Sequence, residues 1–260
     1  MGIPLYFRYL VNNYDNILSN NKKILNIDNL FLDLNCAIHY CCREVLNDVE
    51  YKPHKRVEIE NKFITNIMKY IELLHQYCNT QKMLFIAIDG PAPVAKMVQQ
   101  RQRRFKKFYE QRRLNEIKEN TNHQEPNKNI QVWDTNAITP GTEFMDRLSK
   151  RLKSEIVKNE KLKHLKIIIS DSNIQGEGEH KLLNYIKQHK ELYLESNVIY
   201  GLDADLIMLC LISKLPKIYL LRETVEFDNK IHVNGYKFLY LDINKLKENL
   251  LFEIQDMIDR

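Results

Sequence analysis

Cysteine is scarce in this 260-residue sequence, and its few copies form no familiar metal or disulfide pattern. The five cysteines stand at positions 36, 41, 42, 78 and 210, an odd number without a Cys-x-x-Cys pair. Structural zinc sites and disulfide frameworks both rely on paired cysteines. We therefore predict reduced, mostly buried thiols in a reducing compartment, which excludes a small disulfide-stapled secreted domain.

Long apolar runs are also missing. The longest, "LIMLCLI" at 206–212, is far too short to span a bilayer. The start, "MGIPLYFRYL", has neither the basic head nor the apolar stretch of a signal peptide, and Tyr6 stands where a myristoylation motif requires Ser or Thr. We expect a soluble intracellular protein without a membrane partner, and we favour the cytoplasm over the nucleus.

Glycine and proline number 7 each, and the sequence shows no internal repeat or low-complexity tail. Its length suits one large α/β domain or two small ones, and its hydrophobic fraction of 44% is enough for a substantial core. The net charge of +5, from 39 basic and 34 acidic residues, is too mild to indicate a nucleic-acid partner by itself. The distribution of that charge is more informative.

Apolar strand patterns alternate with helical patterns along the chain. Strands are predicted at 29–35, 82–90, 164–172 and 217–221, and a polar loop at 120–140. The segment 197–212 is predicted to form a strand, a turn with two aspartates and a helix. Helices are predicted at 4–18, 58–79, 94–119, 141–156 and 179–189, with Thr142 as the cap of the fourth. Continuous apolar strands separated by helices are typical of a parallel sheet covered on both faces. We therefore predict an α/β fold with a mainly parallel sheet flanked by helices.

Acidic residues cluster at the predicted strand ends. The six are Asp33, Asp89, Glu177, Glu179, Asp203 and Asp205. One such acid is more often a helix cap or a solvated turn residue. However, the carboxyl ends of parallel strands share one edge of the sheet, so these six should converge there. A cluster of hard oxygen ligands suits two Mg²⁺ or Mn²⁺ ions and two-metal hydrolysis.

A strongly basic helix follows Asp89. The segment 96–113, "KMVQQRQRRFKKFYEQRR", contains a single acid. The simpler interpretation is a solvated helix face or a nuclear localisation signal. Four of its residues nevertheless fall at spacings i, i+4, i+7 and i+8, on one helical face: Lys96, Gln100, Arg103 and Arg104. These donors match a phosphate. A phosphate receptor beside two metals indicates a nuclease that grips a terminal phosphate.

Together these motifs resemble those of the XRN family of 5′-to-3′ exoribonucleases. The matching segments occur in family order between residue 1 and about residue 225: "MGIPLYFRYL", "LDLNCAIH", "AIDGPAPVAKMVQQRQRRF", "NAITPGTEFM", "GEGEHK" and "YGLDADLIML". The resemblance implies a PIN/FEN-like nuclease core. It places the N-terminal nuclease domain at 1–225 and makes 226–260 a C-terminal extension of the same domain, incomplete relative to the family.

The resemblance also implies specific roles. The six acids would be the catalytic metal ligands, and the four residues of the basic helix would bind the 5′-monophosphate. His39 matches a family histidine that stacks on the first base. The implied reaction is Mg²⁺- or Mn²⁺-dependent hydrolysis of 5′-monophosphorylated single-stranded RNA to nucleoside 5′-monophosphates.

Several residues remain open. Asn35 either hydrogen-bonds a ligand carboxylate or caps a helix. His180 and Lys181 belong to "GEGEHK" but receive no role, and Asp171 is expected to be a solvated turn acid. In the family a further Asp, in a "GNDFLP"-like motif, completes the metal site, and this sequence lacks that motif. Asp256 and Asp259 do not replace it, because they lie on a predicted helix in a different sequence context.

Two alternative functions follow. One is a weakly active or inactive RNA-binding module, or an enzyme completed by a second chain that supplies the missing part. The other is a flap-type DNA nuclease on the same core. The phosphate pocket predicted in "AKMVQQRQRRF" argues against this alternative.

Overall fold

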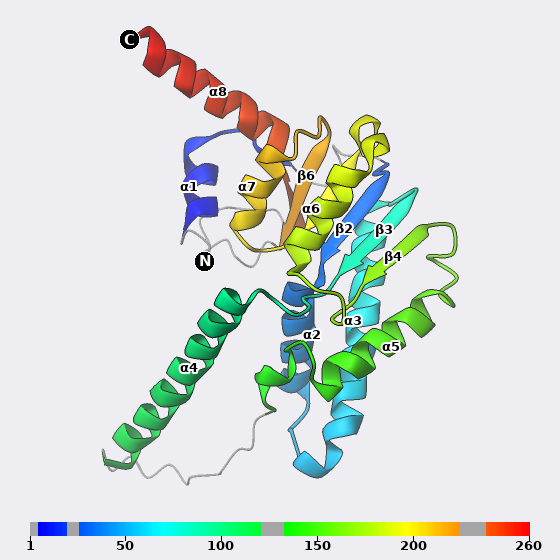
Figure 1. The fold of residues 1–260 in the computed structure, drawn as a ribbon, viewed down its shortest axis with the longest axis vertical. Coiled ribbons are helices and arrows are strands. Elements are labelled where there is room, and N and C mark those ends of the chain that lie inside the picture. Colours follow the sequence, from blue (N-terminus) through cyan, green and yellow to red (C-terminus); the bar gives the residue numbers. More distant parts are fainter. Residues whose placement is uncertain (1–4, 20–25, 121–132, 224–237) are drawn as a thin grey trace.

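The structure, a computed structural model, describes residues 5–19, 26–120, 133–223 and 238–260. Within these ranges the strands form one sheet in the order β1-β7-β6-β5-β2-β3-β4. Figure 1 labels four of them, β6, β2, β3 and β4. The five strands from β6 to β4 are parallel, whereas β7 pairs antiparallel with β6 and β1 antiparallel with β7. The bounds are β1 Leu18–Ser19, β2 Asn29–Asp33, β3 Met83–Ala87, β4 Lys166–Ser170, β5 Asn197–Tyr200, β6 Ile218–Glu223 and β7 Phe238–Asp242.

Helices cover both faces of this sheet. The α-helices are α1 Tyr6–Asn13, α2 Leu34–Asp48, α3 Arg56–Cys78, α4 Val94–Asn120, α5 Glu143–Ile156, α6 Gly178–Gln188, α7 Asp205–Ile212 and α8 Ile243–Asp259. Short 3-10 turns occur at η1 Pro53–Lys55, η2 Thr135–Ala137 and η3 Lys190–Leu194. α2, α3 and α5 pack on one face, and α1, α6, α7 and α8 pack on the other.

The central strand β2 shows why two helical layers are needed. All five of its residues are buried. Leu30 and Leu32 pack into the core on the α2 side, whereas Phe31 packs into the core on the α6 side. Because successive side chains of a strand point to opposite faces, an apolar strand must be covered twice. The predicted α/β class with a mainly parallel sheet is confirmed.

The parallel strands end at the same level. Asp33 pairs with Ala87, and Ala87 pairs with Ser170, so β2, β3 and β4 finish together. Leu32 pairs with Tyr200, which brings the end of β5 to the same edge. The loops that follow these strands therefore meet at one carboxyl edge, where open α/β sheets form their sites.

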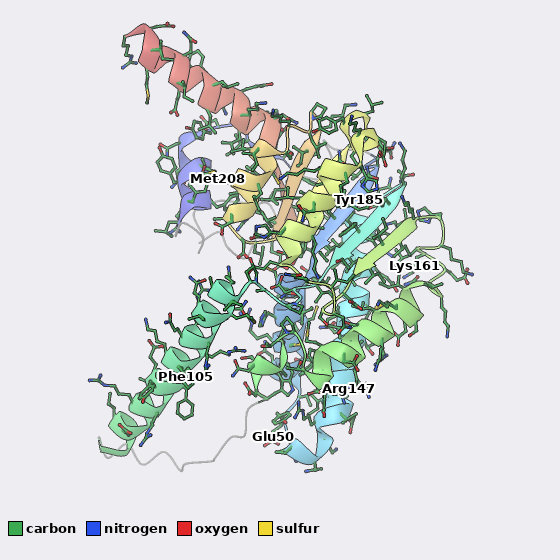
Figure 2. The ribbon with its side chains drawn as sticks, in the orientation of Figure 1. Glu50, Phe105, Arg147, Lys161, Tyr185 and Met208 are labelled. Carbon is green, nitrogen blue, oxygen red and sulfur yellow. The ribbon has the colours of Figure 1, made fainter. Side chains whose placement is uncertain are left out.

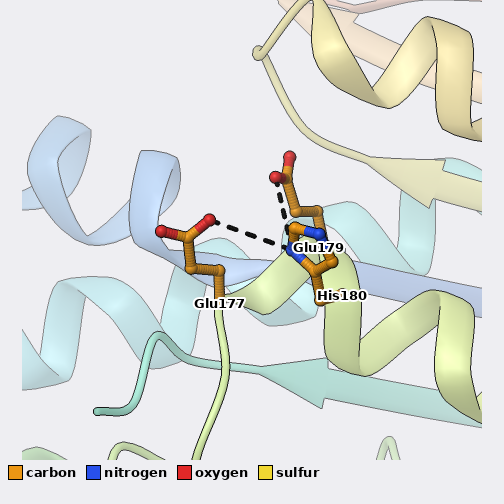
Figure 3. Close-up of side chains that lie close together, drawn as sticks. All are labelled: Glu177, Glu179 and His180. Carbon is orange, nitrogen blue, oxygen red and sulfur yellow. Dashed lines mark ion pairs between the residues drawn. The ribbon is translucent and has the colours of Figure 1, made fainter. Parts of the chain in front are cut away.

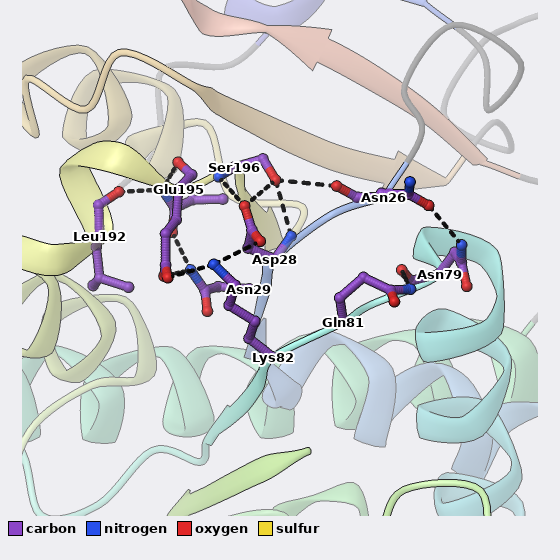
Figure 4. Close-up of polar contacts among 10 residues, drawn as sticks. Asn26, Asp28, Asn29, Asn79, Gln81, Lys82, Leu192, Glu195 and Ser196 are labelled. Carbon is purple, nitrogen blue, oxygen red and sulfur yellow. Dashed lines mark hydrogen bonds and ion pairs between the residues drawn. The ribbon is translucent and has the colours of Figure 1, made fainter. Parts of the chain in front are cut away.

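A polar network ties the opposite, amino edge of the sheet (Figure 4). The Asn29 side-chain amide donates to Asn197 Oδ1 at 3.1 Å and to Glu195 Oε2 at 2.7 Å. Lys82 Nζ lies 2.7 Å from Glu195 Oε1 and 3.0 Å from Asp28 Oδ1. These bonds join the starts of β2, β3 and β5, and they favour a single register because a slip would leave the buried Asn29 side chain unpaired.

The N-terminal prediction needs correction, because the helix predicted at 4–18 ends at Asn13. Asn16 adopts a positive φ of 70°, which no helix continues, and Leu18 pairs with Leu241 of β7. Tyr14 and Ile17 are nevertheless buried. Their apolar side chains correctly predict that these positions are buried, but they do not predict the backbone conformation. The predicted Thr142 cap is confirmed, since its Oγ accepts the Met145 N–H at 3.4 Å.

α4 projects away from the body of the molecule (Figure 1). Phe105, labelled in Figure 2, and its neighbours Phe108 and Tyr109 are all more than half exposed. Pairs at i, i+4, such as Arg112 with Glu116, support this solvent-facing helix locally. Only its first turns approach the carboxyl edge. None of the helices in the described ranges combines the length and the apolar character that crossing a membrane requires.

Candidate active site

A pocket lies at the carboxyl edge, between the ends of the parallel strands and the start of α4. It has a volume of about 230 Å³, which is room for several waters, since a cavity volume of about 10–15 Å³ holds one. We call it the acidic pocket. Its lining comprises Asp33, Asn35, Cys36, Asp89, Lys96, Gln100, Arg103, Glu177, Glu179, Asp203 and Asp205. All six predicted acids and three of the four predicted phosphate residues therefore share one cavity.

Two of these acids occupy helix N-cap positions without acting as caps. Asp33 precedes α2 and Glu177 precedes α6, yet neither side chain makes a capping hydrogen bond within the described part of the chain. Asp33 is 5% exposed, and no hydrogen-bond partner for its Oδ1 is present among the described residues. A buried carboxylate oxygen without a donor is costly. The cap and solvated-turn interpretations therefore do not account for Asp33.

The pocket raises the proton affinity of Asp33, Asp89 and Glu179. Burial raises the pKa of Asp33 well above its ordinary value, and Asp89, Asp203 and Glu179 add repulsion. Burial also raises the pKa of Asp89, although the Gly178 N–H donates to its Oδ1 at 2.6 Å. Burial is also the main cause that raises the pKa of Glu179. These carboxylates need added positive charge in order to be ionised together.

The donor set fits a hard divalent cation. All six acids offer oxygen ligands, which Mg²⁺ and Mn²⁺ prefer, and Asp33 Oδ1 has an unused acceptor site. Gly178 makes room for this arrangement, because a Cβ there would overlap Asp33 Oδ1 and lie 3.4 Å from Asp89 Oδ1. Gly176 adopts a φ of +110°, a conformation that favours glycine. Gly178 thus allows the close packing of carboxylates, and Gly176 allows the turn that precedes Glu177.

The basic helix contributes the other wall of the pocket. Lys96, Gln100 and Arg103 line it, and Lys96 Nζ lies 3.2 Å from Glu177 Oε1. Arg104 is exposed and does not belong to the lining. Arg104 follows Arg103 along the helix and is turned from it by about 100°, and in this conformation only Arg103 reaches the cavity. Three of the four predicted phosphate residues therefore come together here.

His39, the predicted base-stacking residue, also lies outside the pocket lining. It is exposed on α2, about one turn beyond Asn35 and Cys36. Those two residues do line the pocket; the sequence left a site role open for Asn35 and gave none to Cys36. Asn35 Oδ1 accepts the backbone N–H of Asp89 at 3.1 Å, which is neither of the two roles left open for it. Burial and Asp33 raise the pKa of Cys36 to about 12, so its thiol stays protonated.

His180 lies beside the two glutamates of the acidic turn (Figure 3). Its Nδ1 is 3.6 Å from Glu179 Oε1 and 3.8 Å from Glu177 Oε2. One ligand atom from each of the three residues falls within 4.8 Å of the others, so this cluster could hold an ion. The His180 side chain is 60% exposed, and it does not line the pocket. Sequence spacing alone, Glu-x-Glu-His, gave no sign of this approach.

The prediction that Asp171 is a solvated turn acid is wrong. Asp171 is 2% exposed, its Oδ2 lies 2.5 Å from Lys153 Nζ, and its Oδ1 accepts the Asn173 N–H at 3.0 Å. Burial by itself would raise the pKa of Asp171, but Lys153 and the Asn173 amide outweigh it and hold the pKa below its usual value. The carboxylate is buried because α5 supplies its partner, which no local sequence signal reveals.

Comparison with known proteins supports the family resemblance. The model of the XRN 5′-3′ exonuclease N-terminus matches residues 1–224. The chain is 38% identical to 5′-3′ exoribonuclease 2 of Cryptococcus neoformans, over 86% of the chain and 23% of the relative. It is 37% identical to 5′-3′ exoribonuclease 1 of Saccharomyces cerevisiae, over 100% of the chain and 17% of the relative.

The relative in Schizosaccharomyces pombe, 5′-3′ exoribonuclease 1, is 35% identical over 98% of the chain and 20% of its own length. The chain thus spans less than a quarter of each of these three relatives. The mostly parallel sheet flanked by helices is consistent with a PIN-like nuclease core. Since the family model covers most of the sequence, the chain belongs to the XRN 5′-3′ exonuclease family.

Proposed function

We propose that this chain is the catalytic region of a 5′-to-3′ exoribonuclease, with residues 1–225 as its nuclease domain. Its substrate is single-stranded RNA with a 5′-monophosphate, and its products are nucleoside 5′-monophosphates. One observation carries the proposal. The buried carboxylate cluster around Asp33, which requires a cation, shares a cavity with cationic and amide donors from α4.

The six carboxylates would hold two Mg²⁺ or Mn²⁺ ions: Asp33, Asp89, Glu177, Glu179, Asp203 and Asp205. When bound, such ions activate a water for in-line attack on the scissile phosphorus and stabilise the departing 3′ oxygen. The chain itself orients the ligands. The Gly178 N–H fixes the Asp89 carboxylate, and the Asn35 side chain fixes the Asp89 backbone.

The α4 wall would bind the 5′ end. Lys96 offers a point charge, Arg103 a planar fork and Gln100 a neutral amide donor, a set that suits a terminal phosphate monoester. A hydroxyl end would leave these charges unpaired, and a cap or triphosphate would exceed the space. We propose that the exposed Arg104 and His39 contact the substrate outside the lining, Arg104 at the 5′-phosphate and His39 by stacking on the first base.

The test is nucleotide release from 5′-monophosphorylated single-stranded RNA with Mg²⁺, Mn²⁺ or EDTA. The matched RNA with a 5′-hydroxyl and a flap DNA serve as alternative substrates. We expect metal-dependent release of mononucleotides from the phosphorylated RNA, which the double variant Glu177→Gln/Glu179→Gln abolishes. Faster cleavage of flap DNA would make the chain a DNA nuclease instead.

A folded chain that binds the RNA but releases nothing would point to a binding module. Release that begins only when a second polypeptide is added would show that a partner chain completes the site.

A further inference from the structure

Lys181 is buried next to the acidic pocket, at a position where a cation is unfavourable. It lies in the first turn of α6 and is 8% exposed. The N-terminal end of a helix repels positive charge, and a buried ammonium loses its hydration. Both effects oppose a lysine here, so specific contacts must compensate for them.

The ammonium of Lys181 bridges the ends of two strands. Its Nζ donates to the Ile88 carbonyl at 2.6 Å and to the Asp171 carbonyl at 2.8 Å. These are the first carbonyls beyond β3 and β4, because β3 ends at Ala87 and β4 ends at Ser170. Ile88 directly precedes the pocket residue Asp89. One lysine thus joins the ends of β3 and β4 at the point where the loop that carries Asp89 and Gly90 begins; we call this segment the Asp89 loop.

The same side chain lies against the junction of two loops. Gly90 N–H donates to the Gly176 carbonyl at 2.9 Å, and Gly176 N–H donates to the Pro91 carbonyl at 3.1 Å. A Cβ at Gly90 would lie 3.2 Å from Lys181 Nζ, and a Cβ at Gly176 would lie 3.7 Å from its Cγ. At Gly90 the nearest group is the Ile174 carbonyl, with the Lys181 ammonium next to it, and at Gly176 the lysine stem is the nearest neighbour. The lysine therefore lies beside both glycines, between the loop that carries Asp89 and the turn that carries Glu177 and Glu179.

We propose that Lys181 is a positioning residue for the metal site. Its ammonium holds the Asp89 loop and the acidic turn in a fixed relation through backbone carbonyls, and the Gly178–Asp89 hydrogen bond completes this link. Lys181 does not line the pocket, so it acts through the carboxylates and not on the RNA. This role rests on the proposed function, because it concerns the same carboxylates.

The test compares Lys181→Met with the wild-type 260-residue chain. Mn²⁺ affinity is measured by calorimetry without RNA, and kcat and KM are measured with 5′-monophosphorylated RNA. Loss of a residue that orients metal ligands weakens metal binding by about 10–100-fold, and we expect that range together with a lower kcat. With Mn²⁺ at saturating concentration we expect KM to change by no more than about twofold, because the α4 donors are untouched. Lys181→Arg, which keeps a cationic donor, should restore part of the Mn²⁺ affinity.

Lys153→Met is the matched control. It removes the other ammonium at Asp171 but no contact with the Asp89 loop, so it should lower the thermal midpoint and leave Mn²⁺ affinity unchanged. A folded Lys181→Met variant with wild-type Mn²⁺ affinity overturns the proposal. If that variant does not fold, Lys181→Gln is measured in the same way. If neither folds, Lys181 serves stability alone and the proposal also fails. A wild-type chain that binds Mn²⁺ but degrades no RNA contradicts the proposed function, whereas the Mn²⁺ affinity of Lys181→Met, measured without RNA, still decides the role of Lys181.

Discussion

Lys96 Nζ lies 3.2 Å from Glu177 Oε1, so a cation of the proposed phosphate site is paired with a carboxylate of the proposed metal site. Both side chains are largely shielded, with exposed fractions of 31% and 16%. Without metal and RNA, each neutralises the other. A divalent ion that draws Glu177 away would leave Lys96 available for a phosphate. The two sites should therefore be coupled through this pair.

This coupling predicts that metal strengthens binding of a 5′-phosphate more than binding of a 5′-hydroxyl. Affinities of the two RNAs are measured in Glu179→Gln, which retains Lys96 and Glu177, with and without Mg²⁺. We expect Mg²⁺ to widen the preference for phosphate by about fivefold or more. Adding Lys96→Met should remove the Mg²⁺ effect. Equal strengthening of both RNAs by Mg²⁺ would contradict the coupling.

Neutralising Asp33 should separate stability from activity. Asp33→Asn removes a buried charge that lacks a partner at Oδ1 among the described residues and that three other acids repel. In EDTA we expect the variant to be more stable by about 1–2 kcal/mol, a common gain when a strained active-site charge is removed. Nuclease activity and the stabilisation by Mg²⁺ should both be lost. Urea unfolding in EDTA measures the first effect, and an unchanged or lower midpoint would show that the charge is not strained.

The raised pKa of Asp33 predicts how the difference in stability between the wild type and Asp33→Asn depends on pH. In the metal-free folded chain its pKa lies well above the ordinary value of 3.8, so the folded state retains a proton that the unfolded state has released. Stability must then fall as pH rises from about 4 toward the raised pKa. Asn cannot titrate, so the wild type should become progressively less stable than Asp33→Asn over this window. Urea midpoints across the pH series check this, and a difference that shrinks as pH rises would contradict it.

Much of the fold could be predicted because local patterns carry it. The apolar strand around Phe31 requires cover on both faces, and acids such as Asp89 follow the strand ends. Together these patterns place a carboxylate cluster at one edge of a parallel sheet. The helical spacing of Lys96, Gln100 and Arg103 likewise anticipated which residues of α4 share one side.

The remaining features depend on tertiary contacts. The sequence around Asp171 does not predict that Lys153 of α5 neutralises it. The sequence around Lys181 likewise does not predict the two carbonyls that its ammonium bridges. The predicted N-terminal helix extends beyond the observed one because the apolar Ile17, which indicated a helical position, is buried in the core without being helical. Local pattern predicts burial and strand ends well, but it does not identify partners distant in sequence.

The glycine between the two glutamates provides the last prediction. In Gly178→Ala the new Cβ would collide with the buried Asp33 carboxylate, and overpacking at such a site costs about 1–3 kcal/mol of stability. We therefore expect weaker Mn²⁺ binding and slower nucleotide release, together with a lower midpoint of unfolding. Gly141→Ala is the control, because Gly141 has a φ of +86°, open space around it and no place in the pocket lining. That variant should lose about 1 kcal/mol of stability and keep its Mn²⁺ affinity. If Gly178→Ala binds Mn²⁺ as the wild type does, close packing of the turn against Asp33 is not what the metal site requires.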